Sequence, residues 1–190
     1  CGEASTGREA LSLVETTSPD IAVIDISLED RNGVELIRDI VGLRPGFPCL
    51  VLSMYNETMY AMRVLRAGGR GYVMKQEMPR KVLQAIRHIL DGNIYLSEKM
   101  STRLLNHFVA NSSADLPQTS DLSSRELEVL TLIGRGKTTI EIAKDLFISA
   151  KTVAAHRERI KEKLKLKSSN ELLMYAIQFT IDGTTQVRPK

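Results

Sequence analysis

Apolar runs and amphipathic stretches alternate along the first half of the chain. Three runs have the length and β-branched content of buried strands, at 21–25 (IAVID), 49–53 (CLVLS) and 71–75 (GYVMK). Apolar residues recur at helical spacing at 7–17, 34–43, 57–68 and 79–92. Strands that alternate with helices predict βαβ units around a parallel sheet, which is an α/β fold.

Glycine, proline and asparagine mark the boundaries of these elements. The pair Asn32-Gly33 predicts a turn before the helix that follows it. Pro79 stands near the start of the fourth helical stretch and Gly92 near its end, where each residue is favoured.

The second half of the chain carries helical patterns only. A polar segment at 110–121 (ANSSADLPQTSD) has no periodicity and predicts a linker, with a short helix before it at 99–110. Four helical patterns follow, at 122–136, 138–147, 150–166 and 168–181. A short helix, a tight turn (FIS) and a basic helix predict a helix-turn-helix.

Capping residues support the helices of this half. Ser123 and Glu126 have the spacing of a capping box, and Ser149 stands where it can cap the basic helix. We therefore expect one domain at 1–98, a linker with a short helix at 99–120, and a helix-turn-helix domain at 121–190.

Composition is that of an ordinary globular protein. Of the 190 residues, 43% are hydrophobic and 26% are charged, and no apolar run approaches the roughly 20 residues of a transmembrane helix. Cys1 and Cys49 are far apart, which excludes a disulfide framework and favours reduced thiols in a cytoplasmic protein.

Charge is unevenly distributed between the two halves. Residues 1–110 contain 13 basic and 13 acidic side chains, whereas residues 121–190 contain 13 basic and 9 acidic ones. Seven of these basic residues lie within 151–167. Such a segment is compatible with a solvated helix face and with a polyanionic partner.

Three polar side chains end the three predicted strands. Because ligands of open α/β sheets bind beyond the carboxyl ends of the strands, Asp25, Ser53 and Lys75 are expected at one edge. A carboxylate can be a phosphoryl acceptor, while an ammonium and a hydroxyl can hold phosphoryl oxygens. A purely structural pairing of Lys75 with Asp25 explains the same pattern, so both interpretations stay open here.

Both halves resemble known families. Asp25 after IAVI, Asn32-Gly33, Ser53 in LVLS, the helix end LRAGGRGY and Lys75 together resemble a response-regulator receiver domain. Residues LSSRELEVLTLIGRGKTTIEIAKDLFISAKTVAAHRERIKEKLKLKSSNELLMYAI resemble the LuxR/FixJ/NarL type of DNA-binding domain over nearly its whole length. The resemblance implies a flavodoxin-like, doubly wound receiver domain followed by an all-α, four-helix LuxR-type domain.

The receiver resemblance implies a role for each residue at the sheet edge. Asp25 would accept a phosphoryl group from a sensor histidine kinase, and Lys75 would pair with its oxygens. Ser53 and Tyr72 would form the switch that responds to the added charge. Mg²⁺ would be held by Asp25, the backbone carbonyl of Ser27 and an acidic pair that ends the family's first strand.

That acidic pair is absent from this chain. By the resemblance, the family's first strand and helix, roughly thirty residues, precede the segment CGEASTGREAL. We therefore expect Mg²⁺ in an intact protein and none in this chain. Glu29 also departs from the family, which very often has proline at that position.

The basic helix suggests a surface for double-stranded DNA. Lys and Arg side chains supply sequence-independent affinity for phosphates, as do helix N-termini. The candidate contacts are Thr138, Thr139, Lys151, Thr152, Arg157, Arg159, Lys161 and Lys165. The resemblance places base contacts at Ala154, Ala155 and Glu158. His156 fits a packed or phosphate-contacting role better than a metal ligand.

The last helix carries more apolar residues than a small domain requires. In the family this helix can dimerise, which implies a homodimer through Leu172, Tyr175, Ala176 and Phe179. The alternative is that part of this set only closes the local core.

These patterns predict a transcription regulator, not an enzyme, that is phosphorylated on Asp25 and binds promoter DNA as a dimer through helix 150–165. One alternative is a phosphorylation-independent DNA-binding regulator whose first half is a dimerisation or ligand module. A phosphatase or phosphotransferase is the second, but it needs another acid or base near Asp25, and no histidine precedes His88.

Overall fold

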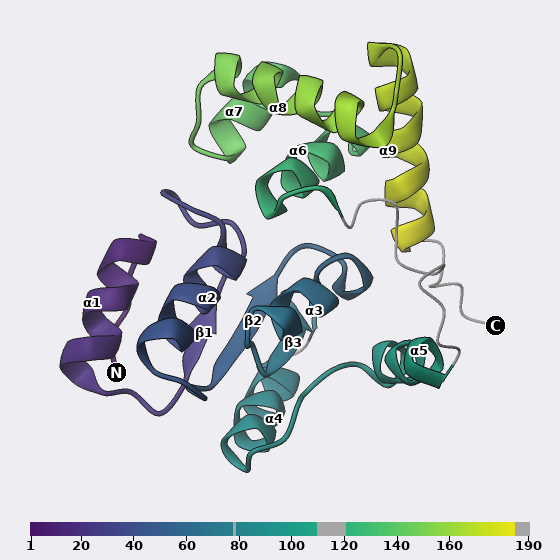
Figure 1. The fold of residues 1–190 in the computed structure, drawn as a ribbon. Coiled ribbons are helices and arrows are strands. Elements are labelled where there is room, and N and C mark those ends of the chain that lie inside the picture. Colours follow the sequence, from purple (N-terminus) through teal and green to yellow (C-terminus); the bar gives the residue numbers. More distant parts are fainter. Residues whose placement is uncertain (78, 110–120, 185–190) are drawn as a thin grey trace. The chain divides into compact units, whose positions relative to one another are not determined.

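The computed structural model describes residues 1–77, 79–109 and 121–184. The chain folds as two compact units, residues 1–112 and 113–190. Figure 1 shows the helices and strands of both units.

The first unit is built on a parallel sheet. Its strands are β1 (Ala22–Ile24), β2 (Cys49–Ser53) and β3 (Gly71–Met74), in the order β1-β2-β3. The pairing places Ile24 beside Val51 and Val51 beside Tyr72. Because all three strands run the same way, their carboxyl ends meet at one edge, as the sequence predicts.

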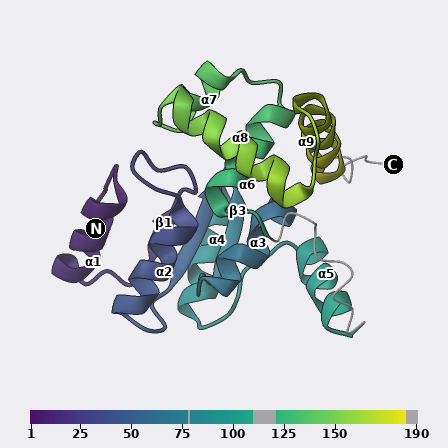
Figure 2. The same cartoon turned by 45° about the horizontal axis from the view of Figure 1, so that its top comes forward.

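Helices α2 (Gly33–Leu43), α3 (Glu57–Arg66) and α4 (Pro79–Leu90) lie along this sheet, and α1 (Gly7–Thr17) lies on the far side of α2 (Figure 2). Between α4 and the sheet lies a hydrophobic core that contains Leu50, Val73, Ala85 and Ile89. Figure 2 shows α1 beside α2, and these two helices are in contact.

Strand β1 is shorter and less covered than its apolar run predicts. Its register sets Val23 beside Leu50, on the face that α4 covers. Since α4 contacts β2 and β3, Val23 at the edge stays 45% exposed. The expectation of a buried strand is therefore wrong at this position.

After α4 the chain returns to the sheet. Tyr95 pairs with the outer edge of β3, accepting a hydrogen bond from the Tyr72 amide at 3.0 Å and donating one to the Arg70 carbonyl at 2.9 Å. Helix α5 (Glu98–Val109) follows and contacts α3. This confirms the short helix predicted at 99–110, although Ala110 and most of the predicted linker lie outside the described residues.

The described residues of the second unit, 121–184, form four helices: α6 (Ser124–Gly134), α7 (Thr139–Asp145), α8 (Ala150–Leu164) and α9 (Ser169–Thr184). Helix α6 contacts the other three. The capping box of Ser123 and Glu126 is present, and Ser149 caps α8, as the sequence predicts. The core contains Leu127, Leu130, Ile142, Val153, Ile160 and Leu172.

Candidate functional site

Asp25 and Lys75 meet at the carboxyl edge of the sheet. The Lys75 Nζ donates to Asp25 Oδ2 at 2.5 Å, and the Ser27 amide donates to Oδ1 at 3.3 Å. Both side chains remain about one-third exposed, at 31% for Asp25 and 38% for Lys75. The carboxylate is therefore held by two donors and is still open to a reactant.

Ser53 and Tyr72 lie behind this pair and are joined through Tyr55. Ser53 is the fully buried last residue of β2, and its Oγ accepts a hydrogen bond from the Tyr55 amide at 3.1 Å. The Tyr72 hydroxyl donates to the Tyr55 carbonyl at 2.8 Å. Burial raises the pKa of Tyr72, and a hydrogen bond with Ser53 opposes this only in part, so the phenol stays protonated.

Tyr55 is a residue of this site that the sequence reasoning missed. Its side chain is buried and stacks on Tyr60 with ring centroids 5.2 Å apart. Its hydroxyl lies 3.4 Å from the Ser27 Oγ. The sequence feature that could have identified Tyr55 is its position two residues after Ser53, the serine that ends a predicted strand.

Gly33 packs closely against the backbone of Asp25. A Cβ at this position would lie 2.1 Å from the Asp25 carbonyl oxygen. The Gly33 amide also donates to the Ile26 carbonyl at 2.7 Å, and the Asn32 Oδ1 accepts from the Val34 amide. The predicted turn pair is thus a helix cap followed by a glycine needed for space.

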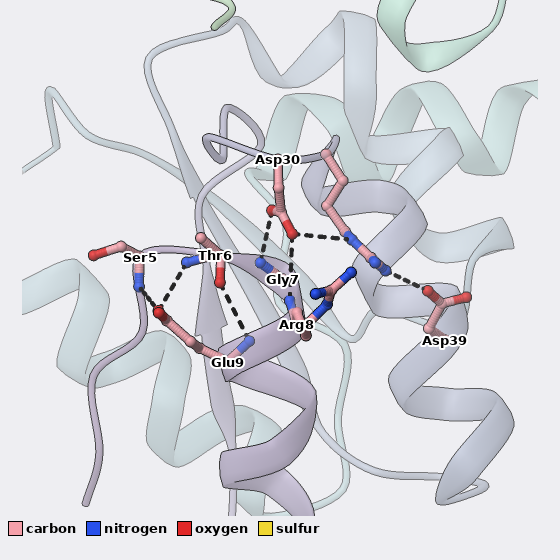
Figure 3. Close-up of polar contacts among 8 residues, drawn as sticks. Ser5, Thr6, Gly7, Arg8, Glu9, Asp30 and Asp39 are labelled. Atoms are coloured by element: carbon pink, nitrogen blue, oxygen red, sulfur yellow. Dashed lines mark hydrogen bonds and ion pairs between the residues drawn. The ribbon is translucent and has the colours of Figure 1, made fainter.

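The loop after Asp25 is tied to the start of α1. Figure 3 shows the Asp30 carboxylate facing the first turn of α1, where it accepts from the Gly7 amide at 2.8 Å and the Arg8 amide at 3.4 Å. Partial burial raises the pKa of Asp30, but these backbone hydrogen bonds and the nearby Arg31 outweigh it, so its pKa is lowered.

Arg31 connects the same loop to α2 by an ion pair. It pairs with Asp39 at 2.6 Å, and its side chain occupies the space that a Cβ on Gly7 would need. Together Asp30 and Arg31 fix the far end of the loop that carries Ser27.

The donors at this edge match part of a Mg²⁺ site. A carboxylate from Asp25 and a carbonyl from Ser27 are the hard oxygen ligands that this ion prefers. Among the described residues, no group of three or more His, Cys, Asp or Glu side chains could hold a metal ion. The nearby Asp30 carboxylate is already engaged with α1.

In the second unit, α7 and α8 form the helix-turn-helix. The turn between them contains Phe147 with a φ of 53°. Val153 and Ile160 face the core, while Lys151, Ala154, Ala155 and Glu158 are exposed on the opposite side of α8. Of the other candidate DNA contacts, these are exposed: Thr138, Thr152, Arg159 and Lys165.

Several of these side chains already have intramolecular partners. Thr138 caps α7 and donates from its amide and hydroxyl to Glu141. The Thr152 and Ser149 hydroxyls lie 2.8 Å apart, and Lys161 pairs with Glu158 at 2.9 Å. Thr139, Arg157 and Lys161 are only partly exposed.

His156 faces inward from α8. Its Nδ1 is buried without a hydrogen-bond partner among the described residues. Burial lowers the pKa of His156; Glu126 opposes this shift, and Arg159, Arg125 and Lys163 reinforce it. This environment favours a packed, neutral imidazole.

Two residues expected at a dimer surface lie in the unit's own core. Leu172 and Ala176 are fully buried, because the absence of a side chain on Gly134 lets α6 approach α9 closely. A Cβ on Gly134 would lie 2.2 Å from the Ala176 carbonyl oxygen. Tyr175 and Phe179 are partly exposed.

The exposed apolar residues of α9 are different ones. Leu173, Met174 and Ile181 project from this helix, with Met174 67% exposed. The sequence reasoning missed Met174 and Ile181, because apolar residues occur on every side of α9.

Comparison with known proteins agrees with this architecture. The family described as "Response regulator receiver domain" matches residues 1–87, and "Bacterial regulatory proteins, luxR family" matches residues 120–176. Oxygen regulatory protein NreC of Staphylococcus carnosus is 39% identical over 180 residues, covering 92% of this chain and 83% of that protein. NreC of Staphylococcus aureus strain MRSA252 is 40% identical with the same coverage.

The chain belongs to the two-component response regulators of the NarL/FixJ type. This response regulator is therefore a DNA-binding transcription regulator, and its family is not one of enzymes. No helix in the described part of the chain is long and apolar enough to cross a membrane.

Solved structures of similar proteins support the same assignment. RcsB from Salmonella enterica serovar Typhimurium, bound to promoter rprA in the presence of phosphomimetic BeF3−, is 26% identical. That match has a TM-score of 0.52 and covers 90% of this response regulator and 81% of RcsB. A LuxR-family response regulator from Aurantimonas sp. SI85-9A1 is 31% identical with a TM-score of 0.53, covering 57% of this chain and 78% of that chain.

Proposed function

We propose that this response regulator accepts a phosphoryl group on Asp25 and, once phosphorylated, binds promoter DNA as a homodimer through α8. The observation that carries the proposal is the contact of Asp25 with Lys75 at the open sheet edge, in a chain that also holds a helix-turn-helix. We further propose a sensor histidine kinase as the phosphoryl donor and the cytoplasm as the location.

The transfer requires one bond to form and one to break. An Asp25 carboxylate oxygen attacks the phosphorus of a phosphohistidine, the phosphorus–nitrogen bond breaks, and the imidazole leaves with its electron pair and takes up a proton. Lys75 contacts the same carboxylate. After the transfer its ammonium can pair with the phosphoryl oxygens and balance their negative charge.

Mg²⁺ supplies charge neutralisation for the phosphoryl oxygens when it is bound. Asp25 and the Ser27 carbonyl are the residues of this chain that would hold it. The Ser27 amide and Lys75 orient the Asp25 carboxylate from the protein side.

Ser53 and Tyr72 form the switch in this proposal. In this structure the Ser53 hydroxyl oxygen accepts a hydrogen bond from the Tyr55 amide. A phosphoryl group on Asp25 would offer the Ser53 hydroxyl a charged acceptor, which makes a stronger hydrogen bond. The buried Tyr72 hydroxyl holds the other side of Tyr55. A shift of Ser53 therefore changes the loop between β2 and α3.

DNA binding is supported by the exposed face of α8. Lys151, Thr152, Arg159 and Lys165 are candidates for phosphate contacts, with Thr138 at the start of α7. Ala154, Ala155 and Glu158 lie on the same exposed face, and their small or acidic side chains offer few hydrogen bonds to bases. RcsB, a relative in structure, is bound to promoter DNA.

A homodimer is proposed through α9, with a corrected set of residues. Tyr175 and Phe179 remain candidates, and Leu173, Met174 and Ile181 join them because they are exposed. Leu172 and Ala176 serve the core instead.

The test is phosphorylation of the full-length protein with acetyl phosphate and Mg²⁺, followed by intact mass spectrometry and a DNA-binding titration. The wild type is expected to gain one phosphoryl mass and bind DNA more tightly. Asp25→Ala is expected to gain none, whereas the matched control Asp20→Ala, at an exposed residue before β1, gains it as the wild type does.

Two results would contradict the proposal in different ways. A phosphoryl mass on Asp25→Ala overturns the assignment of the acceptor. Unchanged DNA affinity and oligomeric state after phosphorylation of the wild type supports the alternative of a phosphorylation-independent regulator.

A further inference from the structure

We propose that Glu57 couples the phosphorylation switch to helix α5, by holding the first turn of α5 in the unphosphorylated chain and releasing it on phosphorylation. The inference rests on the proposed function, since it concerns where a phosphoryl group on Asp25 has its effect. Helix α5 is the last helix of the first unit, and it leads towards the second unit along the sequence.

Glu57 binds the residue that caps α5. It is a buried carboxylate at the first position of α3, and it accepts a hydrogen bond from the Ser97 amide at 2.8 Å and another from the Ser97 hydroxyl. The Ser97 hydroxyl in turn accepts from the Met100 amide at 3.2 Å. The Glu57 carboxylate therefore orients the hydroxyl that caps α5.

The negative charge of Glu57 stabilises the N-terminal ends of two helices, α3 and α5. Glu57 lies in the first turn of α3, and its carboxylate also lies at the start of α5, where negative charge is favourable for each helix dipole. Met100, in the first turn of α5, is buried. Loss of the Glu57 contact therefore removes both the orientation of the cap and a favourable charge.

A continuous set of contacts leads from the switch serine to Glu57. The Ser53 Oγ accepts from the Tyr55 amide, the Tyr55 carbonyl accepts from Tyr72, and only Asn56 separates Tyr55 from Glu57. Asn56 caps α3 by accepting from the Thr58 amide at 2.9 Å. When the Ser53 hydroxyl turns to a phosphoryl oxygen, the Tyr55 amide loses its acceptor and residues 54–56 shift with the start of α3.

The segment before Ser97 is fixed separately. Tyr95 is hydrogen-bonded to both Tyr72 and Arg70 at the edge of β3. This edge stays in place when residues 54–56 move, so a shift of Glu57 changes its distance to Ser97. The contact between Glu57 and Ser97 is thus the point at which the movement is transmitted to α5.

Hydrogen exchange of the α5 amides in the full-length protein tests this coupling. In the unphosphorylated protein, Glu57→Gln and Ser97→Ala are each expected to raise exchange at Met100 and Ser101 by about fivefold, the effect of losing one cap. The double variant is expected to come close to Ser97→Ala alone, because Glu57 acts on the cap of α5 through the Ser97 hydroxyl. Arg103→Gln, at an exposed residue of α5 outside its first turn, is the control and leaves the rates unchanged.

The second arm adds BeF3− with Mg²⁺ to occupy Asp25. In the wild type, exchange at the same amides is expected to rise by about fivefold, and in Ser97→Ala it rises no further. If Glu57→Gln and Ser97→Ala both leave α5 exchange unchanged without BeF3−, the coupling is overturned whatever happens at Asp25.

Mass spectrometry with acetyl phosphate separates the two proposals. A phosphorylated wild type whose α5 exchange does not change overturns the coupling and leaves Asp25 as the acceptor. A wild type that gains no phosphoryl mass overturns the proposed function, and the inference with it.

Discussion

Gly33 lies against the backbone of Asp25 so closely that a Cβ on Gly33 would be 2.1 Å from the Asp25 carbonyl oxygen. The contact is with backbone, which cannot rotate away as a flexible side chain would. Gly33 also begins α2, and its amide donates to the Ile26 carbonyl. The position of the expected phosphoryl acceptor is therefore set in part by a residue eight positions away.

Replacing this glycine should displace Asp25. Gly33→Ala is expected to destabilise the first unit by about 1–3 kcal/mol, as overpacking does, and to slow phosphorylation by acetyl phosphate. Thermal unfolding and intact mass measured over time check the two effects. Gly42→Ala, on the same helix with nothing within 4 Å of its Cβ, is the control and should retain the phosphorylation rate. An unchanged rate in Gly33→Ala would contradict this.

The contact of Asp30 with the start of α1 gives a pH-dependent prediction. The folded pKa of Asp30 is lowered below its ordinary value of 3.8, so its contribution to stability is present above that value and is lost as pH falls through the folded pKa. Asp30→Ala is expected to cost about 1 kcal/mol near neutral pH, as the loss of a helix cap does.

Chemical denaturation across acidic pH tests this prediction. The stability difference between wild type and Asp30→Ala should shrink below pH 3.8 and should be constant above pH 6 or so. Glu29→Ala, which removes the adjacent exposed acid, is the matched control. A difference that persists at low pH would mean that Asp30 acts through packing and not through its charge.

The amino-acid types at the strand ends were enough to predict the edge site. Asp25, Ser53 and Lys75 each follow an apolar run, and parallel strands bring their carboxyl ends together. Asn32-Gly33 shows the limit of this reasoning. A dipeptide indicates a turn or a cap, but only the fold shows that Gly33 is required by the carbonyl of Asp25.

The second unit shows why α9 was harder to interpret. Leu172, Leu173 and Met174 are adjacent apolar residues, and periodicity alone does not tell which one faces α6. The close approach at Gly134 decides that Leu172 is buried and leaves Leu173 and Met174 exposed. Tyr55 and Glu57 were missed because their roles depend on Ser27 and Ser97, which are distant in sequence.

His156 should make the second unit less stable as pH falls below neutrality. Its pKa is lowered from 6.5 in the folded state, so the unfolded chain takes up a proton first and stability drops as pH falls through 6.5. The charges around it are Arg125 and Glu126 on α6 and Arg159 and Lys163 on α8.

Substitution of this histidine should remove that dependence. Stability of the second unit, followed by chemical denaturation between about pH 5 and 8, should vary less in His156→Gln than in the wild type. His88→Gln changes a histidine of the first unit and is the control. Equal pH dependence in wild type and His156→Gln would show that another group is responsible.

DNA binding through α8 should depend steeply on salt. Each Lys or Arg that contacts a phosphate contributes about one unit to the slope of log affinity against log salt concentration. Lys151→Ala and Arg159→Ala are each expected to lower the magnitude of this slope by about one, with a similar loss of affinity for different sequences. Arg103→Ala, at an exposed residue of α5, is the control. A slope unchanged in both α8 variants would exclude this face as the phosphate-binding surface.

The exposed and buried residues of α9 should respond differently to substitution. Met174→Glu adds charge to an exposed apolar surface and is expected to weaken dimerisation by about tenfold or more while retaining the fold, since like charges would meet across a symmetric interface. Leu172→Ala empties a fully buried position and is expected to cost about 2–5 kcal/mol of stability. Sedimentation equilibrium of the phosphorylated protein and chemical denaturation measure the two effects. Ile140→Glu, which adds the same charge at an exposed apolar residue of α7, should leave the dimer intact, and a dimer equally stable in Met174→Glu would rule out this surface.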